Sequence, residues 1–532
     1  MKNSSQKKNN RKKKERKRMN SSLQARYIVE PDLVFGNQGE DKDPRIGLKR
    51  YGPYFYSDET APLESIKVGI IGNRTMIDFT CNILRLIQQE SVSKKSNKWL
   101  YPDYPGMTTI TQFKCNIKTS NNWNAILIDD YDLKKIPDII DPNERINYGV
   151  MLYVDKIKQI RANDDIPDVI VCTLPSIVET WCGISEKTRG AKEVRISPRQ
   201  KEHDELVAKN QKFLTEWGVT FPKPAKEPEK SYDFRNSLKG KVMEFGIPTQ
   251  ILKQSVCERI LNYDKIKKAK NQDPSAFSWN FSTALYYKAN GKPWRLAKLR
   301  TDTCYVGISF FVDKLHPRLE KQISMAQVFT HNGEGLVLRG TEVEIDEHTK
   351  EPYLKEEQAK KLLTEAIAKY ISKANRKPAR VVIHKTSGFS EGEQKGFNDA
   401  IYAQGSTIKD FVAIPTRDPG INFLRMGKYP VLRGTLIELD KTNFLLYTTG
   451  YSPRIRTYAG FRVPNPLKIT HHGDSSKEEI AQEILGLSKL NWNTTSFSTN
   501  LPITISFAKE VGNILSELPE DKDVQDHYRF FM

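Results

Sequence analysis

The sequence predicts an α/β protein with two sheets, one in each half of the 532-residue chain. Between residues 66 and 172, short apolar runs of buried-strand type alternate with helical patterns, which is typical of a parallel sheet covered by helices. From residue 304 onward, three strand-like runs of antiparallel type are followed by helix, strand, helix and strand. That order indicates a second sheet of a different kind. A chain of this length has room for about two to four domains, each with its own core.

Composition divides the chain further. A basic tail covers residues 1–25, and a loop-rich N-terminal segment with turn signals at its Gly and Pro residues covers 26–65. The first alternating region predicts a domain over 66–300. Its polar stretch at 187–230, dense in Lys, Glu and Pro, is interpreted as an insertion. The second sheet predicts a domain over 301–532.

Each expected element follows from hydrophobic periodicity and turn residues. In the first domain these patterns predict strands over 66–71, 125–128, 169–172 and 249–252, and helices over 76–88, 146–160, 232–245 and 276–289. In the second domain they predict strands over 304–311, 326–329, 335–338, 380–384 and 411–414, and helices over 355–374 and 391–402. The turn after the first strand has neither a G-x-G-x-x-G nor a Walker motif, so a nucleotide-cofactor site is not predicted.

The charge balance indicates a polyanionic partner. The net charge is +19 and the pI about 9.3, which favours nucleic acid over a membrane surface. The first twenty residues hold ten Lys or Arg and one Glu, so the tail is either a solubilising segment or a nonspecific nucleic-acid arm. No stretch predicts a transmembrane helix, and six scattered cysteines without a C-x-x-C motif fit a cytoplasmic protein.

One stretch has the features of a phosphate site. In a helix over 232–245, Arg235 and Lys239 are four residues apart and share a face near its first turns, where free N–H groups favour an anion. The strand that follows brings the amide of Gln250 back toward them, and Lys288 on a later helix completes the ring. The alternative is a solvated helix face in a lysine-rich chain.

These residues resemble a motif of the MID domain of Argonaute proteins, which grips the 5'-phosphate of a guide strand. The resemblance rests on Arg-x3-Lys, on a Gln eleven residues after that Lys, and on Tyr-Lys-Ala-Asn-Gly-Lys-Pro-Trp at 287–294. It implies that Arg235, Lys239, Gln250 and Lys288 bind the phosphate. Arg235 stands where many members have Tyr or His. The resemblance therefore implies a positive charge at this position but not an aromatic ring that stacks on the first guide base.

The resemblance extends over about residues 30 to 532. Residues 31–54 are similar to the opening of short prokaryotic Argonautes, which lack the N and PAZ domains. The strand and helix order of the second half is similar to that of PIWI domains, which have an RNase H-like fold. The expected architecture is therefore a Rossmann-like MID domain followed by an RNase H-like PIWI domain.

The PIWI resemblance also locates an active site that has lost its acids. RNase H-like nucleases hold two divalent cations with carboxylates from the first strand, the fourth strand and a late helix. The corresponding positions are Ser309, Thr386 and Lys509. Each replacement removes an anionic ligand, and Lys509 adds a cation. The chain is therefore expected not to be an enzyme and to hold no catalytic metal.

Two other functions stay open at this point. A guided nuclease with unconventional ligands would recruit nearby acids such as Asp313, Glu334, Asp399 and Asp418, although no spacing supports this. A nonspecific basic nucleic-acid-binding protein would need no guide. The pair His471-His472 is interpreted as a surface turn, because adjacent side chains point to different faces and do not share a metal.

Basic and aromatic residues interleave late in the chain, as suits phosphate contacts and base stacking. They are Arg425, Lys428, Arg433, Arg454, Arg456 and Arg462 with Tyr429, Tyr447, Tyr451, Tyr458 and Phe461. The alternative is that the aromatics belong to the core and the cations are merely exposed.

The resemblance implies a function and partners. Members load a small 5'-phosphorylated guide, usually RNA, and pair it with single-stranded DNA of invading elements. They work with an effector subunit that has an APAZ domain fused to a TIR, sirtuin-like or nuclease module. Target binding activates that effector, commonly depleting NAD in abortive-infection immunity, and a higher oligomer on activation is a further expectation. In many Argonautes the terminal carboxylate, here that of Met532, shares Mg²⁺ with the guide phosphate.

Overall fold

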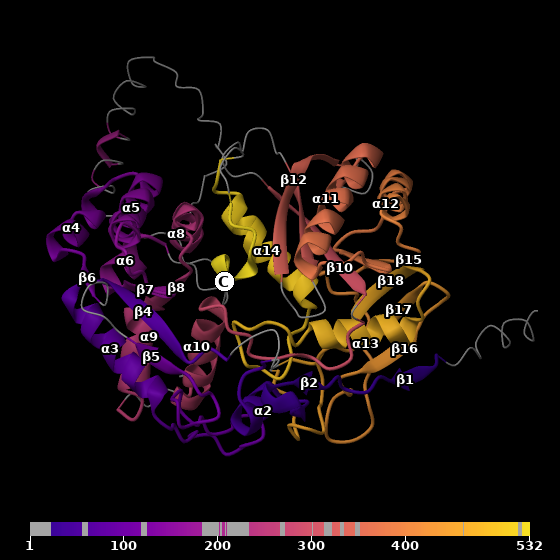
Figure 1. Cartoon of the computed structure of the whole chain (residues 1–532), viewed down its shortest axis with the longest axis horizontal. Helices are drawn as coiled ribbons and strands as arrows, with labels where there is room; N and C mark the ends of the chain where they lie inside the picture. The colour runs from indigo at the N-terminus through magenta and orange to yellow at the C-terminus, as the bar shows by residue number, and fades with distance from the viewer. Residues whose placement is uncertain are drawn as a thin grey trace, which may run out of the picture.

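The computed structural model has two lobes side by side, with the C-terminus between them (Figure 1). The structure describes residues 23–55, 62–118, 125–183, 202, 205–207, 209, 233–265, 272–300, 302–312, 322–329, 335–345, 352–460, 462–519 and 524–532. The expected tail and insertion therefore lie almost wholly outside the described residues.

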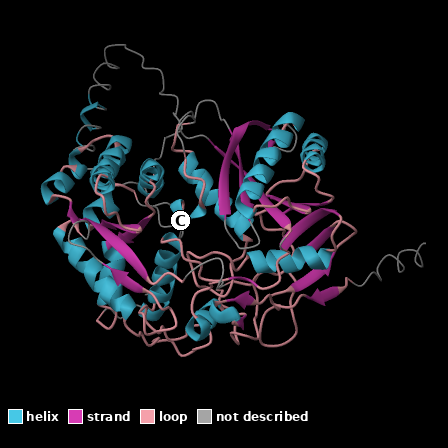
Figure 2. Cartoon of the chain, viewed as in Figure 1, coloured by secondary structure: helices cyan, strands magenta, loops and turns pink. Residues whose placement is uncertain are grey.

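The first lobe is built on a parallel sheet of order β5–β4–β7–β8, in which β6 also pairs with β4. Its strands are β4 (Ser65–Gly72), β5 (Asn116–Lys118), β6 (Ile126–Leu127), β7 (Val169–Leu174) and β8 (Thr249–Lys253). Every residue of β7 is buried, because helices cover both faces of the sheet (Figure 2). The expected parallel sheet is confirmed.

The helices of this lobe are α3 (Arg74–Gln88), α4 (Asp130–Lys134), α5 (Pro142–Arg161), α6 (Ser176–Trp181), α8 (Phe234–Val242), α9 (Gln254–Leu261) and α10 (Pro274–Lys288). Four of them, α3, α5, α8 and α10, lie close to the ranges that periodicity predicts, whereas α4, α6 and α9 are not predicted. Asn or Asp side chains cap α3, α5, α8 and α10 by accepting hydrogen bonds from first-turn amides, which fixes where each helix begins.

The second lobe is built on a ten-stranded sheet of order β1–β16–β17–β18–β15–β14–β10–β11–β12–β13. Its strands are β1 (Ala25–Tyr27), β10 (Thr303–Val312), β11 (Gln322–Phe329), β12 (Gly335–Ile345), β13 (Pro352–Tyr353), β14 (Arg380–Lys385), β15 (Ile408–Ala413), β16 (Thr435–Glu438), β17 (Asn443–Leu446) and β18 (Leu467–Gly473). The antiparallel pairs β10–β11 and β11–β12 and the parallel pairs β10–β14 and β14–β15 confirm the expected order.

Four helices cover this sheet: α11 (Glu356–Ala374), α12 (Glu391–Ala403), α13 (Lys477–Leu487) and α14 (Ile503–Leu515). In Figure 1, α14 lies between β10 and the first lobe, while α11 and α12 lie on the outer side. Gly307 of β10 allows α14 to come close, since a Cβ there would lie 2.0 Å from the carbonyl oxygen of Thr504.

The N-terminal segment is tied to both lobes. Strand β1 pairs with β16, and β2 (Leu33–Val34) lies between β3 (Glu40–Asp41) and β9 (Arg295–Leu296) in a small antiparallel sheet. The helix α2 (Pro44–Tyr51) follows. The buried carboxylate of Glu30 accepts from Arg433 at 2.8 Å and lies 2.7 Å from Lys489. This segment is therefore part of the second lobe's edge and not only an extended opening.

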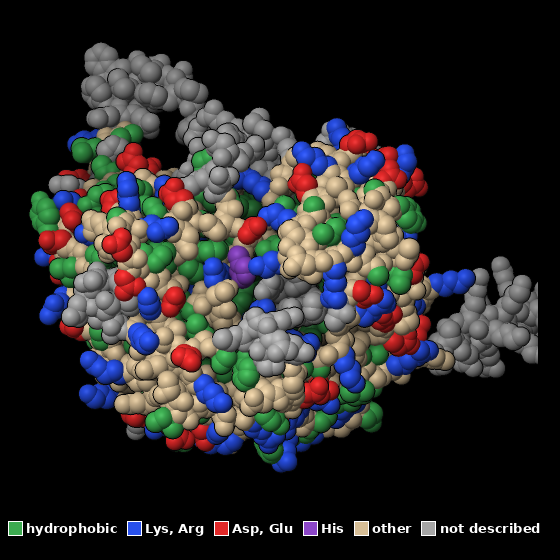
Figure 3. Space-filling view, in the orientation of Figure 1, with side chains coloured by type: hydrophobic (Ala, Val, Ile, Leu, Met, Phe, Trp, Pro, Cys, Tyr) green, Lys and Arg blue, Asp and Glu red, His purple; other side chains and the backbone are tan. Residues whose placement is uncertain are grey.

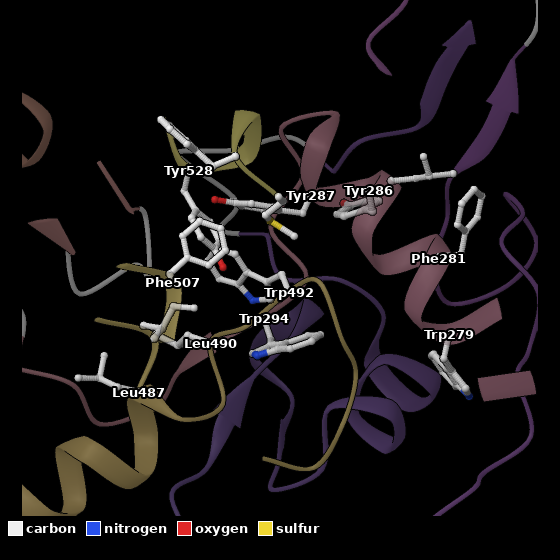
Figure 4. Packing of buried hydrophobic residues seen from close by; sticks show 14 of the residues in the cluster. Trp279, Phe281, Tyr286, Tyr287, Trp294, Leu487, Leu490, Trp492, Phe507 and Tyr528 are labelled. Atoms are coloured by element: carbon white, nitrogen blue, oxygen red, sulfur yellow. The ribbon is translucent and has the colours of Figure 1, made fainter. Parts of the chain in front are cut away.

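A shared aromatic core fixes the lobes against each other (Figure 4). Tyr287 of α10 packs on Trp492 with ring centroids 4.5 Å apart, and Phe507 of α14 packs on Tyr528 at 3.5 Å. The indole N–H of Trp294 donates to the carbonyl of Lys489 at 3.0 Å. A packed interface of this kind holds α10 and the C-terminal residues in fixed relative positions.

Candidate functional site

A cavity of about 300 Å³ opens where the two lobes meet. Its lining residues are Arg235, Lys239, Gln250, Ile251, Leu252, Lys253, Val256, Phe277, Phe281, Lys288, Asn493 and Met532. We call it the cationic pocket. All five residues expected from the sequence to meet a guide phosphate line it, although their role in binding stays a prediction. In Figure 3, Lys and Arg side chains gather around the recess between the lobes.

Helix α8 supplies two of the cations. The Asp233 side chain caps it by accepting from the amide of Asn236 at 3.1 Å, so the helix begins at Phe234. Arg235 and Lys239 then share one face, four residues apart. The helix is shorter than the expected 232–245, because a 3-10 turn replaces its end, and Lys239 lies in its last turn. The prediction that both cations lie near the helix start is therefore right for Arg235 only.

Strand β8 and helix α10 complete the polar wall. The ammonium of Lys239 donates to the carbonyl of Thr249, the first residue of β8. Beside it, the ammonium of Lys288 donates to Oε1 of Gln250 at 2.5 Å, and Nε2 of Gln250 donates to the carbonyl of Ile251 at 3.1 Å. Gln250 thus orients one lysine and is itself held by the strand.

Helix α10 also supplies an apolar surface to the pocket lining. Phe277 and Phe281 of α10 stack with centroids 5.3 Å apart. They precede Lys288 by eleven and seven residues, and these spacings place all three on one helical face. The sequence analysis did not include Phe277 or Phe281 in the site, although their spacing from Lys288 could have indicated them.

The two lysines are buried and lie close to other cations. Both are 1% exposed. Burial, with Lys288 and Arg235 close by, lowers the pKa of Lys239 well below its ordinary value. Burial, again with Arg235 close by, lowers the pKa of Lys288 to about 7. Like charges held together in a buried site favour the neutral forms, and an anion placed among them would favour the charged forms.

The C-terminal residues close the pocket at the side of Arg235. Its Nη2 donates to the carbonyl of Phe531 at 3.2 Å and lies 3.8 Å from the carboxylate of Glu510 on α14. Met532 lines the cavity beside it. These contacts hold the guanidinium at the rim, where part of it is accessible to a ligand.

A second cavity, of about 670 Å³, lies in the second lobe. Ser309 near the end of β10 and Thr386 just after β14 both line it, because β10 and β14 are parallel neighbours. The other lining residues are Phe310, Phe311, Thr416, Leu501, Ile505, Ser506, Asn513 and Ser516. Lys509 lies in α14, and its side chain falls outside the described part of the chain.

The chain is similar to known proteins in both sequence and structure. No protein-family model matches the sequence. A protein argonaute of Cereibacter sphaeroides is 25% identical over 268 residues, which are 45% of this chain and 33% of that protein. The structure of Clostridium butyricum Argonaute bound to a guide DNA and a target DNA superposes with a TM-score of 0.61 at 15% identity. That superposition covers 96% of this chain and 55% of the other.

The chain has the Argonaute MID–PIWI fold. Drosophila Piwi gives a TM-score of 0.56 at 12% identity, over 96% of this chain and 56% of that one. Marinitoga piezophila Argonaute in complex with a 5' OH guide RNA gives 0.51 at 14%, over 92% and 58%. Sequence and structure thus relate the chain to the Argonaute/PIWI family, and it spans just over half the length of these solved proteins.

By that likeness of fold we call the first lobe the MID part and the second lobe, with the Ser309 cavity, the PIWI part; the cationic pocket lies where they meet. Among the described residues, those that line the Ser309 cavity include no Asp, Glu, His or Cys. Across the described residues, no group of three or more such side chains is arranged to hold a metal ion. Of the acids considered from the sequence, the two described ones, Asp399 and Asp418, do not line the cavity. Asp399 lies 3.7 Å from Lys360, Asp418 accepts from Asn465, and Asp313 and Glu334 lie outside the described residues.

The basic and aromatic residues of the PIWI part separate into two groups. Arg433 is buried in an ion pair with Glu30, and Tyr447 is fully buried in the core, so neither faces a ligand. Arg425 and Tyr429 are exposed, and Tyr429 stacks on Tyr451 with centroids 4.4 Å apart. Only part of the set is therefore accessible, and its role in binding nucleic acid stays a prediction.

Two further arginines of the set, Arg454 and Arg456, lie over the ring of Trp99. Arg456 lies over the ring of Trp99 at 4.5 Å, and Arg454 pairs with Asp41 at 2.8 Å. Phe461 lies outside the described residues.

The histidine pair is not a surface turn. His471 and His472 lie in β18, and His471 is buried with its Nε2 2.8 Å from Oδ1 of Asp410. Asp410 also accepts from Arg380 at 2.8 Å, so His471 belongs to a buried ionic network that the sequence pattern did not reveal.

Among the described residues, no helix combines the length and the apolar character needed to cross a bilayer.

Proposed function

We propose that this chain binds a small 5'-phosphorylated guide RNA in the cationic pocket and pairs it with single-stranded target DNA. The observation that supports this most directly is the convergence of Arg235, Lys239, Gln250 and Lys288 on one cavity at the junction of the lobes. A terminal phosphate has about −2 charges at neutral pH and several acceptor oxygens, which matches three cations and an amide.

The apolar surface of α10 supports the same ligand. A nucleotide has a flat base beside its phosphate, and Phe277 and Phe281 provide an apolar surface beside the cations. The guided pairing of a target strand is proposed from the fold, since one matched structure is of an Argonaute bound to guide and target DNA.

The guide phosphate is tested with a double variant, Lys239→Ala with Gln250→Ala. We expect the affinity for a 5'-phosphorylated RNA to fall by at least about tenfold, because charge-assisted contacts are lost, while that for the 5'-hydroxyl RNA changes little. Lys241→Ala, on the same helix but outside the pocket lining, is the matched control. Equal losses for both RNAs, measured by fluorescence anisotropy, would contradict the assignment.

The proposal includes Mg²⁺ at the guide phosphate. A carboxylate at Met532 together with phosphate oxygens would offer the hard, anionic oxygens that Mg²⁺ prefers, and Met532 lines the pocket. When bound, the ion would add positive charge beside Arg235. Removal of Mg²⁺ with a chelator should then weaken binding of the phosphorylated RNA and leave the hydroxyl RNA unchanged. An unchanged affinity of the phosphorylated RNA would argue against the ion.

We also propose that the PIWI part does not cleave. Hydroxyl and amide groups line the Ser309 cavity where two-metal cleavage needs carboxylates. Incubation of the guide-loaded protein with a complementary labelled DNA and Mg²⁺ or Mn²⁺ should leave the DNA intact. Cleavage at one position set by the guide would establish the alternative, a guided nuclease with unconventional ligands.

The partner proposal rests on the resemblance to short prokaryotic Argonautes. We propose that the chain acts with an effector subunit that has an APAZ domain and a TIR or sirtuin-like NAD-consuming module, or a nuclease module. Target binding would then activate that subunit in abortive-infection immunity. Purification of the tagged chain from its native host should yield the subunit in equal amount. Recovery of the chain alone, with no loss of NAD after target addition, would contradict this part.

A further inference from the structure

The loop that joins β15 to β16 presents unusually exposed apolar side chains. Leu424 is 84% exposed and Met426 is 96% exposed. Arg425 and Lys428, which alternate with them, are exposed as well. We call Leu424 to Lys428 the apolar tip. Two large apolar side chains at the end of one loop are costly in water unless a partner covers them.

Both ends of the apolar tip are anchored to the PIWI part. Before it, the amide of Phe423 donates to the hydroxyl of Tyr447 at 2.9 Å, and the Phe423 ring packs on the small core around Tyr447. After it, Tyr429 stacks on Tyr451 with ring planes 21° apart. Gly427, with φ of 112°, allows the tight turn between these anchors. The fold therefore holds the tip outward at a defined place.

The chemistry of the tip fits nucleic acid. Arg425 lies over the ring of Tyr451 at 5.5 Å, so a cation and a stacked aromatic pair adjoin the apolar side chains. Proteins that bend or unstack duplexes insert Leu, Met, Ile or Phe between base steps, with Arg and Lys on the flanking phosphates. The wide, shallow minor groove of an A-form duplex is open to such side chains. The net charge of +19 favours this partner over an apolar protein surface.

We propose that the apolar tip inserts Leu424 and Met426 into the minor groove of the guide–target duplex and unstacks one base step, with Arg425 and Lys428 on the adjacent phosphates. This inference rests on the proposed function, because it takes the guide–target duplex as the ligand. The tip would then mark a fixed position along the duplex, since the cationic pocket holds the other end.

The test places 2-aminopurine, which brightens when unstacked, at successive positions of a target DNA paired to a 5'-phosphorylated guide RNA on the full chain. One position should brighten with the unaltered protein. The double variant Leu424→Ser with Met426→Ser should abolish the increase and weaken duplex binding by about tenfold. Ile110→Ser, equally exposed at 96% in the MID part, is the matched control and should change neither.

Three results would overturn the proposal: no position brightens, the tip variant brightens equally, or the tip variant loses a co-purifying protein while the fluorescence is unchanged. The third result would assign the tip to a protein interface. Discrimination between phosphorylated and hydroxyl guides is measured on the same variant. If unaltered protein lacks that discrimination, the proposed function fails; if discrimination persists and the tip variant behaves as unaltered protein, only the tip assignment fails.

Discussion

Lys288 shows how burial and neighbouring charges shape the electrostatics of the pocket. Its ammonium is buried, faces Gln250 and Arg235, and has a pKa lowered to about 7 by burial first and by Arg235 second. Burial, with Lys288 and Arg235 close by, lowers the pKa of Lys239 as well. Without a ligand the two lysines therefore hold fewer protons near neutral pH than ordinary lysines do.

This predicts a pH dependence of guide binding. A bound phosphate raises the pKa of both lysines, so binding takes up protons above pH 7 and the affinity for a 5'-phosphorylated guide falls as the pH rises toward about 9. Below about pH 6 the phosphate itself takes up a proton and loses its second charge, so the affinity should also fall toward acid pH. The 5'-hydroxyl guide should show neither effect.

Lys288→Arg is the informative variant, because arginine stays protonated over this range. It should flatten part of the pH dependence, with Lys239 responsible for the rest. Calorimetry at pH 8 in buffers of different ionisation enthalpy measures the proton uptake directly. Absence of uptake in the unaltered protein would contradict the account of the pocket.

At the scale of elements, the sequence located most strands and helices but not every side chain's surroundings. Periodicity placed β4, β7 and β14 because buried parallel strands are continuous apolar runs. It did not reveal β1, since three residues of ordinary polarity join the sheet only through pairing with β16. The burial of His471 depends likewise on Asp410 in a neighbouring strand, which no local pattern records.

The residues of the cationic pocket likewise fall into those that the sequence could predict and those that it could not. The spacing of Arg235 and Lys239 and the family motif indicated the polar wall, because these residues are close in sequence or share a recognisable pattern. The part that Met532 plays in the lining depends on how α14 and the last residues return to the MID part. Tertiary packing of that kind has no signature in local composition.

The close approach of α14 to β10 predicts a sharp mutational response. Gly307→Ala would place a methyl group 2.0 Å from the Thr504 carbonyl, so the helix must shift and unfolding should cost about 1–3 kcal/mol less. Gly392→Ala in α12 is the control, because its nearest neighbour is 3.9 Å away and Ala favours helix. Urea unfolding of both variants measures this. Equal stability of the Gly307 variant and the unaltered protein would show that the helix is not held against the strand.

For the whole molecule, the N-terminal segment is a structural part of the PIWI lobe. Burial alone would raise the pKa of the Glu30 carboxyl, but Arg433 and Lys489 hold it below its usual value. Glu30→Ala leaves two buried cations without their anion, a loss of about 3–5 kcal/mol. Amide hydrogen exchange of β1 should then speed up by at least about 100-fold, while Glu40→Ala, at an exposed position in β3, should leave it unchanged. Unaltered exchange in the Glu30 variant would mean that β1 is held by other contacts.

In the proposed function, the cationic pocket binds a strand end and the PIWI part faces the paired strands. The shared core around Tyr287 and Trp492 sets the distance between them, so a guide anchored in the MID part has a fixed path along the PIWI part. The measurement that tests this most directly is a structure of the chain with a 5'-phosphorylated guide RNA. The account predicts the terminal phosphate within hydrogen-bond reach of Lys239 and Lys288. A phosphate in solvent, or bound elsewhere on the basic surface, would contradict it.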